Sequence, residues 1–367
     1  MSNKKKKLPK GTVALISIFA LIIVLLSVFT ILLFNVVDFD TEETKLPGAE
    51  ETLDNHIEDE TGVEVLNELR DAGSLSSILK EWALSGDEGS YMKSRDVYNF
   101  LLIGCDASGS NSDVIMLTTV NTKDKKIHLT SMFRDSYTYI PTSSGKMFAK
   151  INASYATGGA SKLIETVQND YKIKIDYYVS VNFQSFVDVV NILGGITLDV
   201  KQYEAQAVGP DCPYGEGVTL TGEQALMFCR IRKCDADGDV SRTRRQREFI
   251  TALINKSREL GISQIGPIVN SLLKYVKTDC DSTDIIALAT QAVIGKWYGY
   301  TLESSSIPMP EHRMDYNGNA WVWIVDYPAA AKALQESIYG ESNIVLSENR
   351  VTAIDIMKEG STGDAHP

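Results

Sequence analysis

The chain has 367 residues and a formal net charge of −12 at pH 7, with 48 acidic and 36 basic side chains and 44% hydrophobic residues. This length and hydrophobic content allow one large or two ordinary globular domains with a real core. An acidic surface repels the phosphate backbone of nucleic acids, so nucleic-acid binding over a broad surface is excluded.

Five lysines lie within the first ten residues and precede an uncharged apolar run at 12–34. As a helix this run would be about 35 Å long, which is enough to cross a bilayer. A cleaved signal peptide is the alternative, but its apolar core is usually shorter, about 7–15 residues, and no small-x-small cleavage site follows. Because lysines mark the cytoplasmic side, the sequence predicts a cytoplasmic tip at 1–11, one transmembrane helix at 12–34 and an extracytoplasmic body.

Residues 35–96 are expected to form an extracytoplasmic stalk with short helices. The acidic segment 38–59 contains Pro47-Gly48 and has the composition of a flexible connector. Between residues 63 and 84 the spacing of apolar side chains predicts two short helices that break at Gly73.

The folded core is predicted to begin at residue 97. Apolar runs predict strands at 97–104, 114–121, 126–133, 176–183 and 196–200. Helical periodicity predicts helices at 160–170, 184–193, 222–228, 240–260, 264–275 and 282–297, with a last amphipathic helix at 329–337. Strands interleaved with helices indicate an α/β fold, in which a central mixed β-sheet is flanked by helices. We assign 97–260 to the core and 261–367 to a helical part and tail of the same domain.

Half of the twelve arginines in the chain lie in the stretch 226–249, LMFCRIRKCDADGDVSRTRRQREF. Arginine pairs bidentately with phosphate, and a helix N-terminus also favours anions. Arginines that converge on one spot repel one another unless an anion or carboxylates neutralise them. The stretch therefore predicts a di- or polyphosphate pocket, in competition with a solvated helix face that carries ordinary ion pairs.

Two patterns place arginines together within this stretch. On a strand, Arg230-x-Arg232 would turn both side chains to the same face. On a helix with Asp239 as its N-cap, Asp239, Arg242 and Gln246 would share one face. The arginines predicted for the pocket are Arg230, Arg232, Arg242 and Arg245. Those expected in ordinary ion pairs are Arg244 and Arg247.

Two other kinds of site are considered for the same stretch. Asp235-x-Asp237-x-Asp239 has the early spacing of a calcium loop, but its glycine stands at the fourth rather than the sixth position, and Gln246 replaces the bidentate glutamate. The five cysteines include no C-x-x-C pair, so a zinc site is not expected. Outside the membrane, a Cys212–Cys234 disulfide is the pair to test.

Acidic side chains flank the first two predicted strands. Asp106 follows the first strand and Asp113 precedes the second, which would bring both carboxylates to one edge of the sheet. Arg134 adds a cation at the end of the third strand. Together with the arginine stretch these groups could surround a phosphate and one divalent cation, and Mg²⁺ often bridges carboxylates and substrate phosphates. The alternative is that each aspartate caps a turn.

Taken together, six motifs resemble the LytR-CpsA-Psr family in order and approximate spacing, over residues 98–256. They are GCDASGSNSDVIML, FRDS, KINASYATGG, DYYVSVNF, LGGITLDV and LTGEQALMFCRIRKCDADGDVSRTRRQ. The last is the most specific. The family is similar in layout too, with a cytoplasmic basic tip, one membrane helix and an extracytoplasmic α/β domain. Its members attach phosphate-linked glycopolymers, such as teichoic acid or capsular polysaccharide, to peptidoglycan.

The resemblance implies a Mg²⁺-dependent transferase in the cell membrane of a Gram-positive type envelope. Its partners would be a polyprenyl-pyrophosphate-linked glycan and peptidoglycan, and no nucleic acid. The implied metal ligands are Asp106 and Asp113. The implied pyrophosphate contacts are Arg134, Arg230, Arg232, Arg242 and Gln246. The implied catalytic residues are Asp106, Arg134 and Asp239, and either aspartate could accept the proton of the attacking hydroxyl. Lys150 and Asn152 match a K-x-N step of the family, for which no role is specified.

One position departs from the family pattern. The family usually has arginine two residues before the second aspartate, where this chain has Asn111. This weakens one pyrophosphate contact and gives weight to a non-catalytic envelope regulator that binds polyprenyl phosphates. A pyrophosphatase, which would need the same residues and use water as acceptor, is a separate alternative. A cytoplasmic transcriptional regulator is disfavoured, because about eleven residues before the membrane helix are too few for a DNA-binding domain.

Overall fold

The computed structural model describes residues 73–86, 89–105, 112–142, 145–231, 239–259, 276–317 and 321–361. These residues form two compact units. Unit 1 comprises the described parts of Asp124–Ile127 and Val181–Glu303, and unit 2 comprises the described parts of Glu42–Lys123, His128–Ser180 and Ser304–Pro367.

The largest sheet is mixed and has six strands in the order β10-β3-β2-β1-β6-β9. The strands are β1 (Val97–Cys105), β2 (Ser112–Asn121), β3 (Lys126–Met132), β6 (Tyr177–Asn182), β9 (Lys277–Thr278) and β10 (Thr301–Ile307). Strand β1 pairs antiparallel with β2 from Val97↔Asn121 to Cys105↔Ser112, with an irregularity after Gly104. The predicted strands at 97–104, 114–121, 126–133 and 176–183 are confirmed within one or two residues, as is the mixed sheet with flanking helices.

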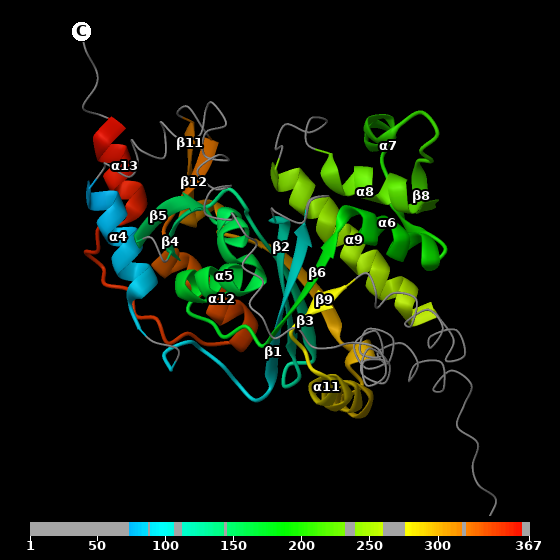
Figure 1. Ribbon diagram of the computed structural model, residues 1–367, viewed down its shortest axis with the longest axis horizontal. Coiled ribbons are helices and arrows are strands. Elements are labelled where there is room, and N and C mark those ends of the chain that lie inside the picture. The colour runs from blue at the N-terminus through cyan, green and yellow to red at the C-terminus, as the bar shows by residue number, and fades with distance from the viewer. Residues whose placement is uncertain are drawn as a thin grey trace, which may run out of the picture. The chain divides into compact units, whose positions relative to one another are not determined.

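Unit 2 adds two hairpins and four helices to its share of the sheet. The elements are α4 (Gly73–Leu84), β4 (Tyr137–Thr142), β5 (Gly145–Lys150), α5 (Ala153–Tyr171), η3 (Pro310–His312), β11 (Arg313–Asn317), β12 (Trp321–Val325), α12 (Tyr327–Tyr339) and α13 (Ala353–Ser361). Helix α12 lies beside α5, and α13 lies beside α4 (Figure 1). The amphipathic helix predicted at 329–337 corresponds to α12. It was predicted to be the last helix of the chain, which is wrong because α13 follows it.

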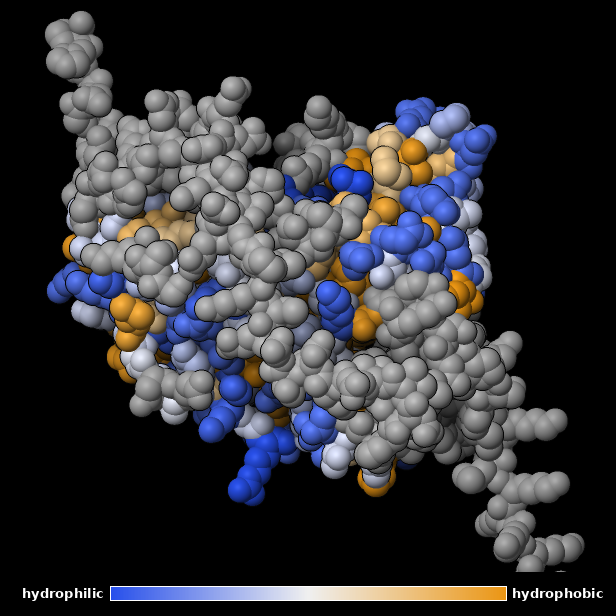
Figure 2. Space-filling model, viewed as in Figure 1, coloured by the Kyte–Doolittle hydropathy of each residue, from blue (hydrophilic) through white to orange (hydrophobic). Residues whose placement is uncertain are grey.

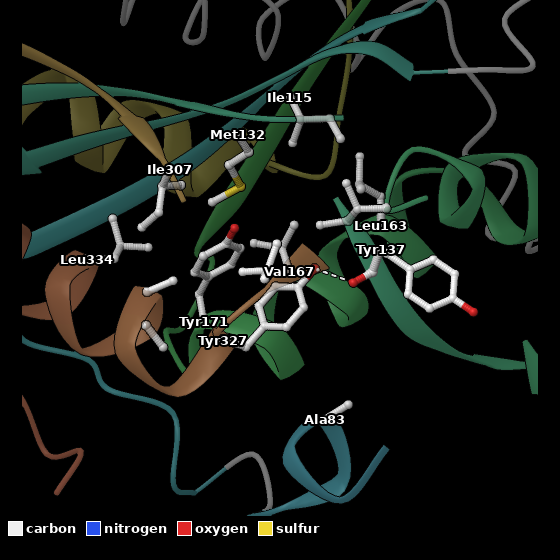
Figure 3. Close-up of a cluster of buried hydrophobic side chains, with 14 of the residues drawn as sticks. Ala83, Ile115, Met132, Tyr137, Leu163, Val167, Tyr171, Ile307, Tyr327 and Leu334 are labelled. Carbon is white, nitrogen blue, oxygen red and sulfur yellow. Dashed lines mark hydrogen bonds between the residues drawn. The ribbon is translucent and has the colours of Figure 1, made fainter. Parts of the chain in front are cut away.

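The core of unit 2 is built from tyrosines and aliphatic side chains between these helices and the sheet (Figure 3). Tyr171 and Tyr327 meet edge to face with ring centroids 5.8 Å apart, and the Tyr327 hydroxyl donates to the Tyr137 carbonyl at 3.3 Å. Leu163 and Val167 of α5 are fully buried in the same cluster. These contacts hold α5, α12 and the β4–β5 hairpin together.

Unit 1 contains a small β7–β8 hairpin and several helices. Its elements are α6 (Phe183–Ile192), β7 (Ile196–Val200), α7 (Gln202–Val208), β8 (Gly215–Leu220), α8 (Gly222–Arg230), α9 (Asp239–Glu259), α11 (Ser282–Gly295) and η2 (Trp297–Gly299). Helix α8 packs against α6 and α9, the rings of Phe186 in α6 and Phe249 in α9 are in contact, and α9 packs against β7 (Figure 1). At Gly222 an added Cβ would lie 2.3 Å from the Val187 carbonyl oxygen, so only glycine lets α8 approach α6 so closely. The predicted helices at 184–193, 222–228 and 282–297 are confirmed within two residues, the strand at 196–200 is confirmed, and the helix predicted at 240–260 is confirmed as far as the structure describes it, to Glu259.

Helix α5 begins earlier than predicted because it contains a kink. The predicted helix at 160–170 starts directly after Gly159. The φ of +63° at this residue is favourable only for glycine. The first turns, from Ala153, precede this kink.

Several predictions fall outside the described residues. They are the tip at 1–11, the membrane helix at 12–34, most of the stalk at 35–96, the helix at 264–275, the aspartates of the calcium-loop pattern before Asp239, and Cys234. Among the described residues no helix is long and apolar enough to cross a membrane. Cys212 is a buried thiol, and its burial raises its pKa.

On the face shown in Figure 2, the described side chains of unit 1 are mostly hydrophilic, with hydrophobic ones scattered among them. The exposed large hydrophobic side chains of the described residues come from separate parts of the chain, namely Leu84, Tyr203, Tyr214, Met227, Ile294, Val345 and Val351. Such scattered exposure is normal for the surface of a folded protein.

Unit 2 also buries a carboxyl group, that of Asp170 at the end of α5. The Thr138 hydroxyl donates to its two oxygens at 2.8 and 2.9 Å. Burial raises the pKa of Asp170 to about 8, although the bonds from Thr138 and the nearby Lys172 act in the opposite direction. The carboxyl group is therefore held mainly in its neutral form at neutral pH.

We predict that Asp170→Asn changes how the stability of the protein depends on pH. The pKa of Asp170 is raised above its ordinary 3.8 in the folded state, so its stabilisation is complete below that value and is lost as pH rises towards about 8. The amide keeps one acceptor oxygen for the Thr138 hydroxyl but does not titrate. In thermal unfolding, the melting temperature of the variant relative to wild type should therefore rise between about pH 5 and pH 8. The exposed Asp96→Asn is the control, and a difference that stays constant with pH would contradict the prediction.

Candidate active site

The loop after β3, Phe133-Arg134-Asp135, is fixed by backbone hydrogen bonds from three other segments. The amide of Phe133 donates to the Ile307 carbonyl at 3.1 Å, that of Asn152 to the Arg134 carbonyl at 3.3 Å, and that of Trp323 to the Asp135 carbonyl at 3.0 Å. The Phe133 side chain is buried. The loop therefore presents Arg134 from a rigid base within unit 2.

Four charged side chains meet at this loop and are called the Arg134 cluster. Arg134 Nη1 donates to Asp113 Oδ1, and Arg134 Nε lies 3.5 Å from Asp135 Oδ2. Lys150 Nζ lies 2.8 Å from Asp135 Oδ1. The four side chains are between 10% and 31% exposed, so solvent reaches them although they are held in place.

The cluster contains two cations and two carboxylates in a partly desolvated position. The carboxylates orient the guanidinium and the ammonium group and neutralise their mutual repulsion. An anionic ligand can compete for both cations, because their hydrogen-bonding capacity exceeds what the carboxylates use. The arrangement is suited to binding a phosphate group.

The structure brings together Asp113 and Arg134, as the sequence predicted. It also adds Asp135 and Lys150 as an ion pair. The β4–β5 hairpin explains this, because its register pairs Tyr137 with Lys150 and returns the lysine to the start of the hairpin. The lysine of the K-x-N motif was noticed in the sequence, but the hairpin that places it was not predicted. Asp106 and Asn111 lie outside the described residues.

In unit 1, Arg230 is the last residue of α8, so the strand expected for Arg230-x-Arg232 is wrong at its first position. Its side chain is exposed, and its guanidinium carbon lies 4.5 Å from the centre of the Phe183 ring. Cation–π stacking of this kind holds the guanidinium in one orientation while its edge remains open to hydrogen bonding. Arg232 lies outside the described residues.

Helix α9 begins at Asp239 and carries Arg242 and Gln246 one turn apart. Both side chains are buried, at 4% and 7% exposure, and Gln246 Nε2 donates to the Cys229 carbonyl at 3.4 Å. The helix thus confirms the predicted common face of these two residues. For Asp239 the structure describes the backbone alone.

Arg245 was predicted to line the phosphate pocket, but it is an internal residue of unit 1. Its side chain is fully buried, with Nε 2.9 Å from Glu204 Oε1 and Nη1 3.2 Å from the Ile231 carbonyl. Arg244 pairs with Glu248 and Glu204, at 2.7 and 3.1 Å, which confirms the ordinary ion pair expected for it. Glu204 of α7 is therefore the acceptor for two arginines of α9.

The protonation of Glu204 reflects these contacts. Burial alone would raise the pKa of its carboxyl group, but the hydrogen bonds from the Lys201 amide, Arg245 and Arg244 together lower it. The carboxylate is therefore charged at neutral pH and neutralises a guanidinium that has no access to solvent. This pairing joins α7 to α9. It also explains why not every arginine of the stretch 226–249 is available to bind a ligand.

Of the two carboxylates predicted to hold a metal, the structure describes Asp113. Within the described ranges there is no group of three or more histidine, cysteine, aspartate or glutamate side chains arranged to hold a metal ion. The carboxylate of Asp113 accepts from Arg134 at one oxygen, and a carboxylate has lone pairs for further contacts. Its chemistry therefore fits a shared Mg²⁺ site that takes other ligands from phosphate oxygens.

The sequence and the fold of the chain are similar to those of one family of known proteins. A sequence model described as "LytR_cpsA_psr family" matches residues 59–338. A polyisoprenyl-teichoic acid–peptidoglycan teichoic acid transferase, TagU, of Bacillus licheniformis is 38% identical over 197 residues, which cover 52% of this chain and 62% of the relative. Biofilm regulatory protein A of Streptococcus mutans is 32% identical over 256 residues, covering 64% of this chain and 61% of the relative.

Solved structures agree with the sequence relatives. The structure "TagT bound to LI-WTA" is similar with a TM-score of 0.55 and 28% identity, over 70% of this chain and 94% of that one. The chain spans about three fifths of the length of the two sequence relatives described above.

The buried pair of Glu204 and Arg245 predicts a large effect on stability. Glu204→Gln removes the negative charge paired with the buried Arg245 guanidinium, and breaking a buried ion pair in this way typically costs about 3–5 kcal/mol of unfolding free energy. Denaturant unfolding measures this loss. Glu248→Gln is the matched control, because its carboxylate also pairs with Arg244 but is 42% exposed, and its loss should stay below about 1 kcal/mol. Equal losses for the two variants would show that burial does not control the strength of this network.

Proposed function

The chain belongs to the LytR-CpsA-Psr family, and on this basis we propose that it transfers a phosphate-linked glycopolymer from a polyprenyl-pyrophosphate carrier to peptidoglycan, releasing polyprenyl phosphate. The observation that carries the proposal is the Arg134 cluster, a preorganised phosphate-binding arrangement within a chain that the family model matches over residues 59–338. The similarity to TagU and to TagT bound to LI-WTA supports a teichoic acid as the polymer class.

The proposed reaction is a single displacement at phosphorus. A hydroxyl group of peptidoglycan attacks the phosphorus next to the glycan, and the bond from that phosphorus to the bridging oxygen of the pyrophosphate breaks. The hydroxyl proton passes to a base, for which Asp106 and Asp239 are the candidates. Negative charge grows on the leaving phosphate, so fixed cations stabilise the transition state more than the ground state.

Each described residue has a role that its contacts support. Arg134, oriented by Asp113 and Asp135, donates to phosphate oxygens from the rigid loop after β3. Lys150 is held by the same Asp135 and adds a second positive charge. In unit 1, Arg230 is exposed and stacked on Phe183, and the family resemblance assigns it to the pyrophosphate.

The remaining roles follow from the family resemblance. We assign Arg232, Arg242 and Gln246 to the pyrophosphate, and Asp106 with Asp113 to Mg²⁺. When bound, the cation would neutralise charge on the phosphate oxygens. The carboxylate oxygens of Asp113 are of the type that Mg²⁺ prefers.

We further propose that the body of the protein lies outside the cell membrane, anchored by residues 12–34, since lysines flank only the N-terminal side of this run. Protease added to intact protoplasts should therefore digest the body. A cytoplasmic protein serves as the control for membrane integrity. Protection of the body from protease under these conditions would refute the topology.

The transfer assay gives the direct test of the catalytic residues. Arg134→Ala removes charge-assisted hydrogen bonds worth about 1.5–3 kcal/mol each, so kcat/KM for transfer to peptidoglycan should fall by about 10- to 100-fold. Asp113→Asn should abolish transfer while much of the affinity for the lipid pyrophosphate remains, because the arginines provide most of the attraction. Lys332→Ala is the control, since Lys332 pairs with Glu336 on the surface of α12.

The same assay separates the transferase from the two alternatives. The similarity to Biofilm regulatory protein A and the presence of Asn111 favour, as the second candidate, a non-catalytic regulator that binds polyprenyl phosphates. If wild type releases no polyprenyl phosphate with Mg²⁺ and acceptor present but Asn111→Arg does, the regulator is the better description. Release that needs no peptidoglycan would instead indicate a pyrophosphatase.

A further inference from the structure

The β11–β12 hairpin of unit 2 has two faces of different character. Its antiparallel register pairs Asp315 with Trp323 and Asn317 with Trp321, and directly paired residues project to the same side of a sheet. The alternate residues Val322 and Ile324 are buried in the core of unit 2. The other face therefore carries two tryptophans together with a carboxylate and an amide.

The two tryptophans are held in fixed orientations. Their rings meet at 73° with centroids 4.6 Å apart. The Arg313 guanidinium carbon lies 4.4 Å from the centre of the Trp323 ring and 4.3 Å from that of Phe133. Arg313 Nη1 also donates to the Pro308 carbonyl at 2.7 Å. Trp323 is thus fixed by a stack, and Trp321 is fixed against Trp323.

The outer part of this face remains accessible. Trp321 is half-buried, whereas Asp315 and Asn317 are exposed. An aromatic face attracts the C–H groups of a sugar ring, since the negative face of its quadrupole meets their partial positive charge. The neighbouring carboxylate and amide supply acceptors and donors for sugar hydroxyl and N-acetyl groups. A few polar groups beside an apolar wall are the usual composition of a site that orients a small ligand.

This face is attached directly to the Arg134 cluster. The Trp323 amide donates to the Asp135 carbonyl at 3.0 Å, and the rings of Phe133 and Trp323 lie 5.7 Å apart. The residues on either side of Arg134 therefore both contact Trp323. A sugar bound on the hairpin would lie beside the loop that carries the phosphate-binding arginine.

We propose that Trp321, Asp315 and Asn317 form a saccharide subsite for the acceptor glycan strand of peptidoglycan, an inference that rests on the transferase function. The carboxylate of Asp315 decides between the two glycans of the reaction. It accepts hydrogen bonds from the hydroxyl and N–H groups of the uncharged N-acetylglucosamine units of that strand but repels a polymer that carries a phosphate in each repeat. The donor polymer is therefore disfavoured at this position.

The test measures binding of two probes to the full-length chain in lipid nanodiscs. One probe is an uncharged tetrasaccharide of β-1,4-linked N-acetylglucosamine, and the other is a poly(glycerol phosphate) fragment. Trp321→Ala and Asn317→Ala should each weaken tetrasaccharide binding by about tenfold, or about 1.4 kcal/mol. They should raise KM for peptidoglycan more than they lower kcat. Trp321→Phe keeps an aromatic face and should stay within about threefold of wild type.

Tyr214→Ala is the matched control, since Tyr214 is an aromatic residue of unit 1 with 59% exposure. It should bind the tetrasaccharide as wild type does. Asn317 is exposed, so its variant tests the site even if Trp321→Ala fails to fold. Unchanged tetrasaccharide affinity in Asn317→Ala and in folded Trp321→Ala overturns the subsite, as does a selective loss of poly(glycerol phosphate) binding.

Arg134→Ala separates the subsite from the transferase function. Its kcat/KM for transfer should fall by about 10- to 100-fold, yet it should retain tetrasaccharide binding, because the Arg134 guanidinium contacts Asp113 and Asp135 rather than the rings of the hairpin. If wild type transfers polymer and the hairpin variants bind and transfer normally, the subsite is wrong and the function stands. If wild type transfers nothing but the hairpin variants lose tetrasaccharide binding, the proposed function fails while the saccharide site remains.

Discussion

The pairing of Arg134 with Asp113 and Asp135 is the interaction on which the candidate site depends. A guanidinium at the end of a strand has many rotamers, and ordering it on ligand binding costs conformational free energy. Here the two carboxylates and the anchored loop order the guanidinium during folding. The cation is therefore already in place when a ligand binds. The same carboxylates compete with a phosphate for Arg134. The arrangement thus binds the ground state less tightly but holds the guanidinium in a fixed geometry. This geometry stabilises a transition state whose charge develops at one point.

The arginines of α9 show why a charge-rich sequence is not by itself a ligand site. Arg242 and Arg245 are three residues apart and so lie close together around the helix, yet Arg245 is tied within unit 1 by Glu204. A buried guanidinium without this carboxylate would carry a large desolvation penalty. Glu204 accepts from Arg244 as well, so this acidic residue on the short helix α7 pairs with two arginines of α9.

The sequence predicted the central strands well because their apolar runs are continuous, as in β1 and β3, where burial on both faces leaves little ambiguity. It also predicted that Asp113 and Arg134 would meet, because both lie at strand ends on neighbouring strands. It did not predict the β4–β5 hairpin or helix α7, which are short and have weak periodicity. Those two elements place Lys150 beside Asp135 and Glu204 beside Arg245. The missed contacts are therefore long-range ion pairs whose partners lie on elements too short to be identified from periodicity alone.

A glycan transferase must also favour a sugar hydroxyl over water, which is smaller and always present. Charge stabilisation at the phosphate does not distinguish these two nucleophiles, since it acts on the leaving group in both cases. Discrimination has to come from binding energy that only the glycan can provide, and this energy increases the rate when the bound hydroxyl is held near the phosphorus. The surface that binds the glycan must therefore be rigidly connected to the phosphate contact. The β11–β12 hairpin meets this condition within unit 2, because backbone and ring contacts join Trp323 to both neighbours of Arg134. A flexible connection would bind the sugar equally well but would lose the orientation on which selectivity for the acceptor depends.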